Sequence, residues 1–353
     1  MGPVLSWSLI MNLSPDDSAV FSIRDAQSGE MPAITELAVA AFTTFEVFGP
    51  SWWSDAGVLP AILSGVRGSL SRVAIDTASG RLVGHAQWTP VDMHLGGHAI
   101  RAAWLAPLSV HPDWQNRGVG GLLMRDGIAC LRAAGVDLLA ILGHDFYYPR
   151  FGLLTGCHGR HGLTVPLPTP LPEDPAGWRL RPVAVGDPQA CRDLWRKLCG
   201  GVDGAVDPGE GLLPWVSKTR DIVSCVLERE GRIVGHARFD KRKDSGAEKS
   251  VQRFLAADAE AAAVLAGRLV AMAGWQGDSL YLPLPSASPA VRKILASLVA
   301  SQDAIIAVHE TWSAGMAMAL RDGSAGAAGT NPGAVNVGAH LEAIRRGELP
   351  PLY

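Results

Sequence analysis

The sequence predicts an α/β protein built from two related halves. Its 353 residues are enough for about two domains, and 48% hydrophobic against 18% charged residues is an ordinary globular balance. A segment at residues 80–88 recurs at residues 231–239, and each copy follows an apolar strand, so each predicts a β-hairpin. The strand-to-helix unit that begins at Ile23 recurs at Leu180. The repeat indicates that one architecture occurs twice.

Strands and helices follow one another through the first half. The first unit ends in a helix over residues 34–42, and the hairpin of residues 73–88 comes next. An apolar run ends at Val110, and apolar residues at helical spacing then predict a helix over residues 118–134. Residues 137–142 are almost wholly apolar, which is typical of a buried central strand.

The second half repeats this order and extends it. Its expected elements after the hairpin are a strand over residues 250–255, a helix over 261–273, a strand over 279–284, a helix over 289–300 and a strand over 316–320. Between the halves, residues 164–177 carry prolines at 166, 168, 170, 172 and 175, which excludes an interior strand and predicts a stiff linker. Residues 323–353 are expected to form a flexible tail, because residues 323–339 are rich in Gly, Ala and Asn. One or two helical turns are expected within it over residues 341–346.

A glycine-rich stretch separates the apolar run at Val110 from the helix over residues 118–134. Glycines at a helix start leave backbone N–H groups exposed at the positive end of the helix, as in a phosphate-binding loop. The P-loop is excluded because no Gly-Lys-Ser/Thr follows. The dinucleotide fingerprint is disfavoured because Leu123 stands where a small residue belongs. A third class of phosphate loop and a plain turn before a helix are the remaining interpretations.

Two motifs match one superfamily. A Gln/Arg-x-x-Gly-x-Gly/Ala loop is present at Gln115, Gly118 and Gly120. A Leu-Gly-x-x-x-Tyr-Tyr-x-Arg-Phe-Gly-Phe signature is matched, apart from its last residue, at residues 142–153. On these motifs the chain resembles the GNAT acetyltransferases over residues 21–163, and most of all bacterial predicted N-acetyltransferases. The resemblance implies a mixed, mostly antiparallel central sheet flanked by helices.

The second half departs from this family where the loop would be. Residues 256–261 hold no glycine pair, and Asp258 and Glu260 at the helix start would repel a pyrophosphate. The resemblance therefore implies tandem GNAT folds of which the second is degenerate, distantly similar to acetyltransferases of the enhanced-intracellular-survival type. The expected parts are an acetyl-CoA-binding domain over residues 1–163, a linker over 164–177, a degenerate GNAT-like domain over 178–322 and a tail over 323–353.

The resemblance implies acetyl-CoA as the cofactor. Backbone N–H groups of the loop would hold its pyrophosphate, and an N–H near Ser109 or Val110 would stabilise the thioester oxygen during transfer. The pantetheine arm would pair with the same strand edge. The residues expected to bind the cofactor are Leu108, Ser109, Val110, Gln115, Asn116, Arg117, Gly118, Val119, Gly120, Gly121, Leu122 and Tyr147.

The implied reaction, acetyl transfer to a primary amine, also needs an acid and a base. In the family a tyrosine four residues before the signature glycine protonates the thiolate, and here that tyrosine is Tyr148, with Tyr147 as second choice. A phenol stays protonated at neutral pH because its pKa is near 10. His111 is a candidate for the base, because imidazole titrates near neutrality. Further candidates are His144, Asp145, Glu46 and the C-terminal carboxylate of Tyr353.

Aromatic residues between the first helix and the second strand indicate a wall of the acceptor pocket, with ordinary core packing as the alternative. The expected acceptor-binding residues are Phe45, Trp52 and Trp53. The acceptor itself is expected to be the amine of a small molecule or a peptide.

Composition restricts partners and location. A net charge of −3 without a basic block disfavours nucleic acid and anionic membranes as partners. Five cysteines without a Cys-x-x-Cys pair indicate a reducing compartment, so we expect a cytoplasmic protein. No metal site is expected, and the resemblance allows a homodimer. A non-catalytic acyl-CoA sensor, or a structural protein with a GNAT-derived fold, is the alternative function.

Overall fold

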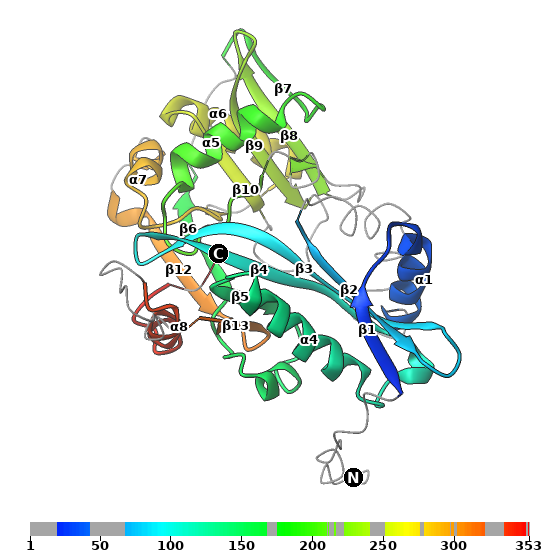
Figure 1. Cartoon of the computed structure of the whole chain (residues 1–353). Coiled ribbons are helices and arrows are strands. Elements are labelled where there is room, and N and C mark those ends of the chain that lie inside the picture. The colour runs from blue at the N-terminus through cyan, green and yellow to red at the C-terminus, as the bar shows by residue number, and fades with distance from the viewer. Residues whose placement is uncertain are drawn as a thin grey trace, which may run out of the picture. The chain divides into compact units, whose positions relative to one another are not determined.

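The computed structural model describes residues 20–42, 68–167, 175–209, 211, 215–216, 222–240, 251–275, 279–296, 298–299, 302–321, 335–350 and 352 (Figure 1). The chain divides into two units. Unit 1 comprises Met1–Pro90 and Ala103–Gly135, and unit 2 comprises Val91–Ala102 and Val136–Tyr353. Helices and sheets alternate as predicted, so the mixed α/β fold class is confirmed.

Unit 1 is a sheet with two helices. Its elements are β1 (Phe21–Asp25), α1 (Met31–Phe42), β2 (Leu70–Asp76), most of β3 (Leu82–Leu95), most of β4 (His98–Val110) and α4 (Val119–Ala133). Strand β1 pairs antiparallel with β2, and β2 pairs antiparallel with β3. The first predicted hairpin and the long helix after the glycine-rich loop are therefore confirmed.

Two glycines let α4 approach the sheet of unit 1. A Cβ on Gly84 of β3 would lie 2.7 Å from Val119 Cγ1, and a Cβ on Gly127 of α4 would lie 2.1 Å from ring atoms of Trp88. The apolar face of α4 is buried along its length. Its buried residues include Val119, Leu123, Met124, Ile128 and Leu131. This packing fixes the position of the N-terminus of α4, where the glycine-rich loop ends.

The two halves of the sequence exchange strands within unit 2. Strand β13 (Gly315–Ala319), from the second half, pairs antiparallel with β5 (Leu138–Leu142) of the first half. Strand β6 (Gly159–Pro166), from the first half, lies between β11 (Ser279–Leu282) and β12 (Ile306–Thr311) of the second half. Unit 2 therefore contains residues from both sides of the boundary expected at residue 163.

The remainder of unit 2 repeats the hairpin architecture. Its elements are β7 (Trp178–Pro182), α5 (Pro188–Cys199), β8 (Ile222–Arg229), β9 (Arg232–Asp240), β10 (Val251–Ala256), α6 (Ala259–Ala273) and α7 (Pro289–Leu295). The strands form a sheet of order β10-β9-β8-β7, and both α5 and α6 pack against β9. The predicted elements of the second half are confirmed, except that β11 ends at Leu282 and not at residue 284, and α7 ends at Leu295 and not at residue 300. Strand β12 was not predicted.

The expected linker begins inside a strand. Val165 is buried and pairs with Leu280 of β11, so residues 164–166 belong to β6. Pro166 is the last residue of the strand, a position where its missing N–H is tolerated. The prolines therefore do not prevent strand pairing up to Pro166, where β6 ends.

The expected tail contains a packed helix, which begins before the one or two turns predicted over residues 341–346. Helix α8 (Val337–Arg345) begins at Asn336, whose side chain accepts a hydrogen bond from the Ala339 N–H at 2.9 Å. Leu352 is also buried, and its N–H donates to the Cys157 carbonyl. Burial of apolar side chains orders this segment, although its composition is rich in small residues. The buried residues of α8 are Val337, Leu341 and Ile344.

Gly127→Ala tests the close approach of α4 to Trp88. Alanine normally stabilises a helix interior by about 1 kcal/mol relative to glycine, but here its methyl group would overlap the indole ring. We expect the free energy of unfolding to fall by about 1–3 kcal/mol in urea denaturation, the usual cost of overpacking. Gly338→Ala in α8 is the control, because the nearest atom would lie 3.5 Å away and stability should not fall. Unchanged stability in Gly127→Ala would contradict the packing.

Candidate cofactor and catalytic site

The glycine-rich loop places bare backbone N–H groups at the start of α4. Strand β4 ends at Val110, and Gly118 forms the N-cap of α4 with a φ of +84°. The first helical hydrogen bond runs from the Leu122 N–H to the Gly118 carbonyl at 3.0 Å. The N–H groups before it therefore have no acceptor within the helix. They belong to Val119, Gly120 and Gly121.

The start of α4 is suited to an anion. Gly118 has no side chain that could cap the helix, and the first turn holds no acidic residue. The helix dipole adds partial positive charge at the same place. Arg117 is exposed just before the helix. This combination of bare N–H groups and positive charge can hold a phosphate or pyrophosphate.

Residues before Gly118 shape the loop. The Gln115 side-chain amide donates to the Val110 carbonyl at 3.1 Å and so ties the loop to the end of β4. Asn116 has a φ of +59°, a left-handed conformation that asparagine tolerates better than most residues. Gln115 and Asn116 thus fix the path of the backbone between β4 and α4.

The end of β4 carries Leu108, Ser109 and Val110. Ser109 is 1% exposed, and its hydroxyl has no hydrogen-bond partner within the described part of the chain. A buried hydroxyl without a partner is costly. A polar ligand bound at this end of β4 would supply the partner that the Ser109 hydroxyl lacks.

His111 caps a short 3₁₀ turn, η3 (Pro112–Trp114). Its ring Nδ1 accepts a hydrogen bond from the Asp113 N–H at 3.2 Å, and the backbone N–H of His111 donates to the Val83 carbonyl at 2.9 Å. Since Nδ1 is an acceptor here, the proton of the neutral imidazole is on Nε2. In that tautomer the Nδ1 lone pair is occupied by the Asp113 N–H. The geometry therefore assigns His111 a capping role.

The predicted tyrosines lie in unit 2, on the turn after β5. Tyr148 begins the 3₁₀ helix η4 (Tyr148–Phe151), and the N–H groups of Tyr147 and Tyr148 both donate to the His144 carbonyl. The two rings meet edge to face with centroids 4.9 Å apart. The Arg150 guanidinium lies 3.8 Å from the centroid of the Tyr147 ring. These contacts fix the orientation of the two tyrosine rings relative to each other.

Burial raises the pKa of Tyr148 above its usual value near 10, and the neighbouring Tyr147 raises it further. Tyr148 is 8% exposed. Its phenol is therefore protonated at neutral pH, as a proton donor must be.

Comparison with known proteins identifies the family of the first half. Residues 22–153 match the family model described as an acetyltransferase (GNAT) domain. Over this segment the chain is similar to GNAT acetyltransferase domains. The uncharacterised N-acetyltransferase YjhQ of Escherichia coli K12 is 41% identical over 95 residues, which make up 27% of this chain and 51% of that protein. The chain thus spans about half the length of the curated relatives it matches.

Two solved structures share the fold over a longer part of the chain. A conserved protein of Enterococcus faecalis V583, described as a probable N-acyltransferase, has a TM-score of 0.58 at 13% identity and covers 85% of this chain and 72% of its own. Eis1 of Mycobacterium abscessus has a TM-score of 0.54 at 18% identity, with 85% and 74% covered. At such identities the likeness concerns the fold alone, and it extends beyond the GNAT domain into the second half.

The second half carries a different helix start where the GNAT domain has its loop. Asp258 caps α6 by accepting a hydrogen bond from the Ala261 N–H at 2.9 Å. Arg229 binds Asp258 at 2.7 Å and Glu260 at 3.0 Å. A capped N–H and two carboxylates leave little affinity for a pyrophosphate.

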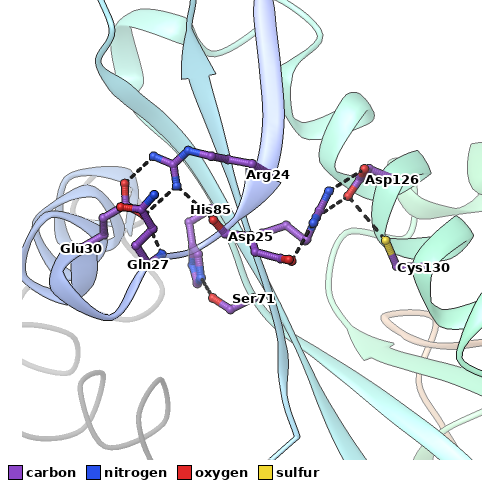
Figure 2. A network of polar contacts seen from close by, with 9 residues as sticks. Arg24, Asp25, Gln27, Glu30, Ser71, His85, Asp126 and Cys130 are labelled. Carbon is purple, nitrogen blue, oxygen red and sulfur yellow. Dashed lines mark hydrogen bonds and ion pairs between the residues drawn. The ribbon is translucent and has the colours of Figure 1, made fainter.

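His85 and His236 occupy equivalent positions of the repeat, and both are buried sheet residues. His85 Nε2 lies 2.8 Å from Ser71 Oγ on the neighbouring strand, as Figure 2 shows. His236 Nε2 lies 3.4 Å from Ser224 Oγ and 3.2 Å from the Trp215 carbonyl. The same histidine–serine pairing in both halves indicates a structural role.

The described part of the chain also holds a cavity outside the predicted site. Unit 2 holds a cavity of about 740 Å³ lined by residues that include His161, Lys197 and His340, none of them a predicted site residue. No cluster of metal-ligating side chains occurs among the described residues. No helix in the described part of the chain is long and apolar enough to cross a membrane. The predicted acceptor residues Phe45, Trp52 and Trp53 lie outside the described residues, as do Glu46 and Tyr353.

Gly143, at the start of the turn that carries Tyr148, was not among the predicted site residues. A Cβ on Gly143 would lie 2.7 Å from Tyr148 Cε2, so the ring packs directly on this glycine. Gly143 is the second residue of the signature at 142–153, and its place in that motif was the only available signal.

The buried histidines predict a pH dependence of stability. Burial lowers the pKa of His85 to about 4 and that of His236 to about 3. Both values lie below the unfolded value of about 6.5, so below that pH the unfolded chain binds protons that the folded chain does not. Stability is then complete above about pH 6.5 and is lost as the pH falls toward 4, by up to about 1.4 kcal/mol per pH unit for each group.

Urea unfolding between pH 7 and 5.5 measures this dependence. His85→Gln should show a weaker decline in unfolding free energy than the wild type, whatever its absolute stability. The exposed His98 provides the control, because His98→Gln should keep the wild-type decline. The same decline in His85→Gln as in the wild type would be inconsistent with a neutral buried His85.

Proposed function

We propose that the protein is an N-acetyltransferase that moves an acetyl group from acetyl-CoA to a primary amine by direct attack in a ternary complex. The observation that carries the proposal is the uncapped start of α4, with three consecutive backbone N–H groups beside a loop of the GNAT type. The family match covers this loop and the tyrosine signature together.

The residues present fit acetyl-CoA. The N–H groups of Val119, Gly120 and Gly121 would hold its pyrophosphate, and no carboxylate of the first turn opposes them. The buried Ser109 hydroxyl and the backbone at Val110 would line the thioester end. Bound acetyl-CoA supplies an activated acetyl group, and a backbone N–H at the end of β4 would stabilise negative charge on the carbonyl oxygen.

Tyr148 is the proposed proton donor. The neutral amine nitrogen would bond to the acetyl carbon as the carbon–sulfur bond breaks. The sulfur would take the electron pair, and the proton shed by the amine nitrogen would go to solvent water. The Tyr148 phenol would give its proton to that sulfur. Its raised pKa keeps the proton in place until the thiolate develops. We assign no base to His111, because its ring is engaged in capping η3.

The second half would bind no acetyl-CoA. Its equivalent helix start is capped by Asp258 and carries Glu260, both paired with Arg229. We therefore propose a tandem arrangement, with one cofactor site in a chain that has two GNAT-like folds. The acceptor in this proposal is an amine of a small molecule or peptide.

Calorimetric titration with acetyl-CoA tests the cofactor site. We expect about one site per chain in the wild type, and loss of binding in Gly118→Asp, whose carboxylate would cap the N–H groups and repel the pyrophosphate. Gly80→Asp is a matched control, because Gly80 also has a positive φ, +68°, and open space around it. Two sites per chain would refute the degenerate second half. No binding by the wild type would refute the acetyltransferase proposal.

Tyr148→Phe tests the proton donor. In a screen of primary amines that follows release of the CoA thiol, we expect kcat with the best acceptor to fall about 100-fold or more, with KM for acetyl-CoA unchanged. Tyr281→Phe is the control, because its hydroxyl donates to the His161 carbonyl and has no assigned role in transfer. Binding of acetyl-CoA without turnover of any amine would instead support a sensor.

A further inference from the structure

The turn that carries Tyr148 is bound at both ends to a strand from the far end of the chain. Where the turn begins, the Gly143 N–H donates to the Ala314 carbonyl at 2.9 Å, directly before β13. Where it ends, Leu154 and Ala317 exchange two backbone hydrogen bonds of 2.8 and 3.0 Å. The Cys157 N–H then donates to the Gly315 carbonyl at 2.9 Å. Strand β13 therefore fixes both points from which the turn departs and returns.

The ring of Tyr148 rests on one of these fixed points. Gly143 has no Cβ, and the ring occupies the space that a Cβ would need, at 2.7 Å from Tyr148 Cε2. The ring thus packs on the backbone unit whose N–H is held by Ala314. A shift of β13 would move Gly143 and the surface on which the ring lies.

The far end of η4 also meets β13. Gly152 ends η4 with a φ of +93°, and the position of its absent Cβ lies 3.3 Å from Met318 Sδ. Gly315 is packed as tightly, since a Cβ there would lie 2.3 Å from the His158 carbonyl oxygen. Met318 is buried. The strand is wedged between the turn and the residues that follow it, so it has little freedom to slide.

We propose that β13 is a positioning element for acetyl transfer, which holds the Tyr148 hydroxyl in place through Gly143 and Gly152. The proposal rests on the proposed function, in which Tyr148 donates the proton. It gives the second half of the chain a part in the reaction, although that half has no cofactor loop. Gly315 and Met318 are the positioning residues, and neither is expected to touch acetyl-CoA.

Gly315→Ala tests the proposal, because its methyl group must displace β13 from the His158 carbonyl. Met318→Ala is a second variant that removes the contact under Gly152 without a clash, should the first fail to fold. Gly186→Ala is the matched control, since Gly186 has no atom within 4 Å of a Cβ and no positive φ. Circular dichroism and a thermal melt confirm that each variant is folded.

The first readout is NMR of protein labelled with ¹³C at tyrosine Cζ. The chain has four tyrosines, and Tyr148→Phe assigns the resonance of Tyr148. We expect Gly315→Ala and Met318→Ala to shift this resonance and to lower the pH at which it titrates, because the ring loses its buried place. The Gly186→Ala spectrum should match the wild type. An unchanged Tyr148 resonance in both folded β13 variants would overturn the proposal.

The second readout is a double-mutant cycle on kcat. Gly315→Ala should lower kcat at least 10-fold with KM for acetyl-CoA within twofold, yet change kcat less than twofold when Tyr148 is already phenylalanine. Independent losses that multiply would show a merely structural effect and overturn the positioning role. If Tyr148→Phe alone leaves kcat unchanged, the proton-donor assignment fails, and the NMR result still decides whether β13 holds the ring.

Discussion

Backbone pairing between distant strands is the constraint on which unit 2 depends. Each half of the sequence supplies one strand to a sheet of the other, β13 beside β5 and β6 between β11 and β12. A strand deprived of its partner would leave a row of N–H and carbonyl groups unsatisfied. Within unit 2, therefore, described strands of each half pair with strands of the other half. This pairing joins residues from both sides of the boundary expected at residue 163.

The two long helices after the fourth strand of each repeat show how little sequence separates a phosphate site from a closed helix start. In α4 the N-cap is Gly118, which leaves the first N–H groups bare. In α6 the N-cap is Asp258, which satisfies one of them and adds negative charge that Arg229 neutralises. A capping carboxylate stabilises a helix by about 1 kcal/mol, so loss of a cofactor site can improve the local fold.

Local patterns predicted most of the elements, because a strand or helix is encoded in its own periodicity. The glycine-rich loop and the hairpins were found in this way, as was the start of α4 near Gly118. Strand partners were not, since alternation along β6 says which face is buried but not which strands lie on either side. The role of His111 depends on the Asp113 N–H, a contact made by backbone geometry that residue type does not reveal. Composition predicted loose order up to residue 339 and so did not register that α8 begins at the buried Val337.

The start of α6 and strand β13, both in the second half, are constrained by the surrounding structure to different degrees. A pyrophosphate loop depends on a few residues at one helix start, so substitutions there remove binding without disturbing the sheet. Strand β13 pairs with β5 along its whole length, and Ala314, directly before it, accepts a hydrogen bond from the Gly143 N–H. Its first residue, Gly315, has no room for a side chain. Any change that loosens β13 also loosens the turn on which Tyr148 lies. If the second half has lost a cofactor loop, as proposed, β13 would be retained, because it pairs with β5 and with the turn that carries Tyr148.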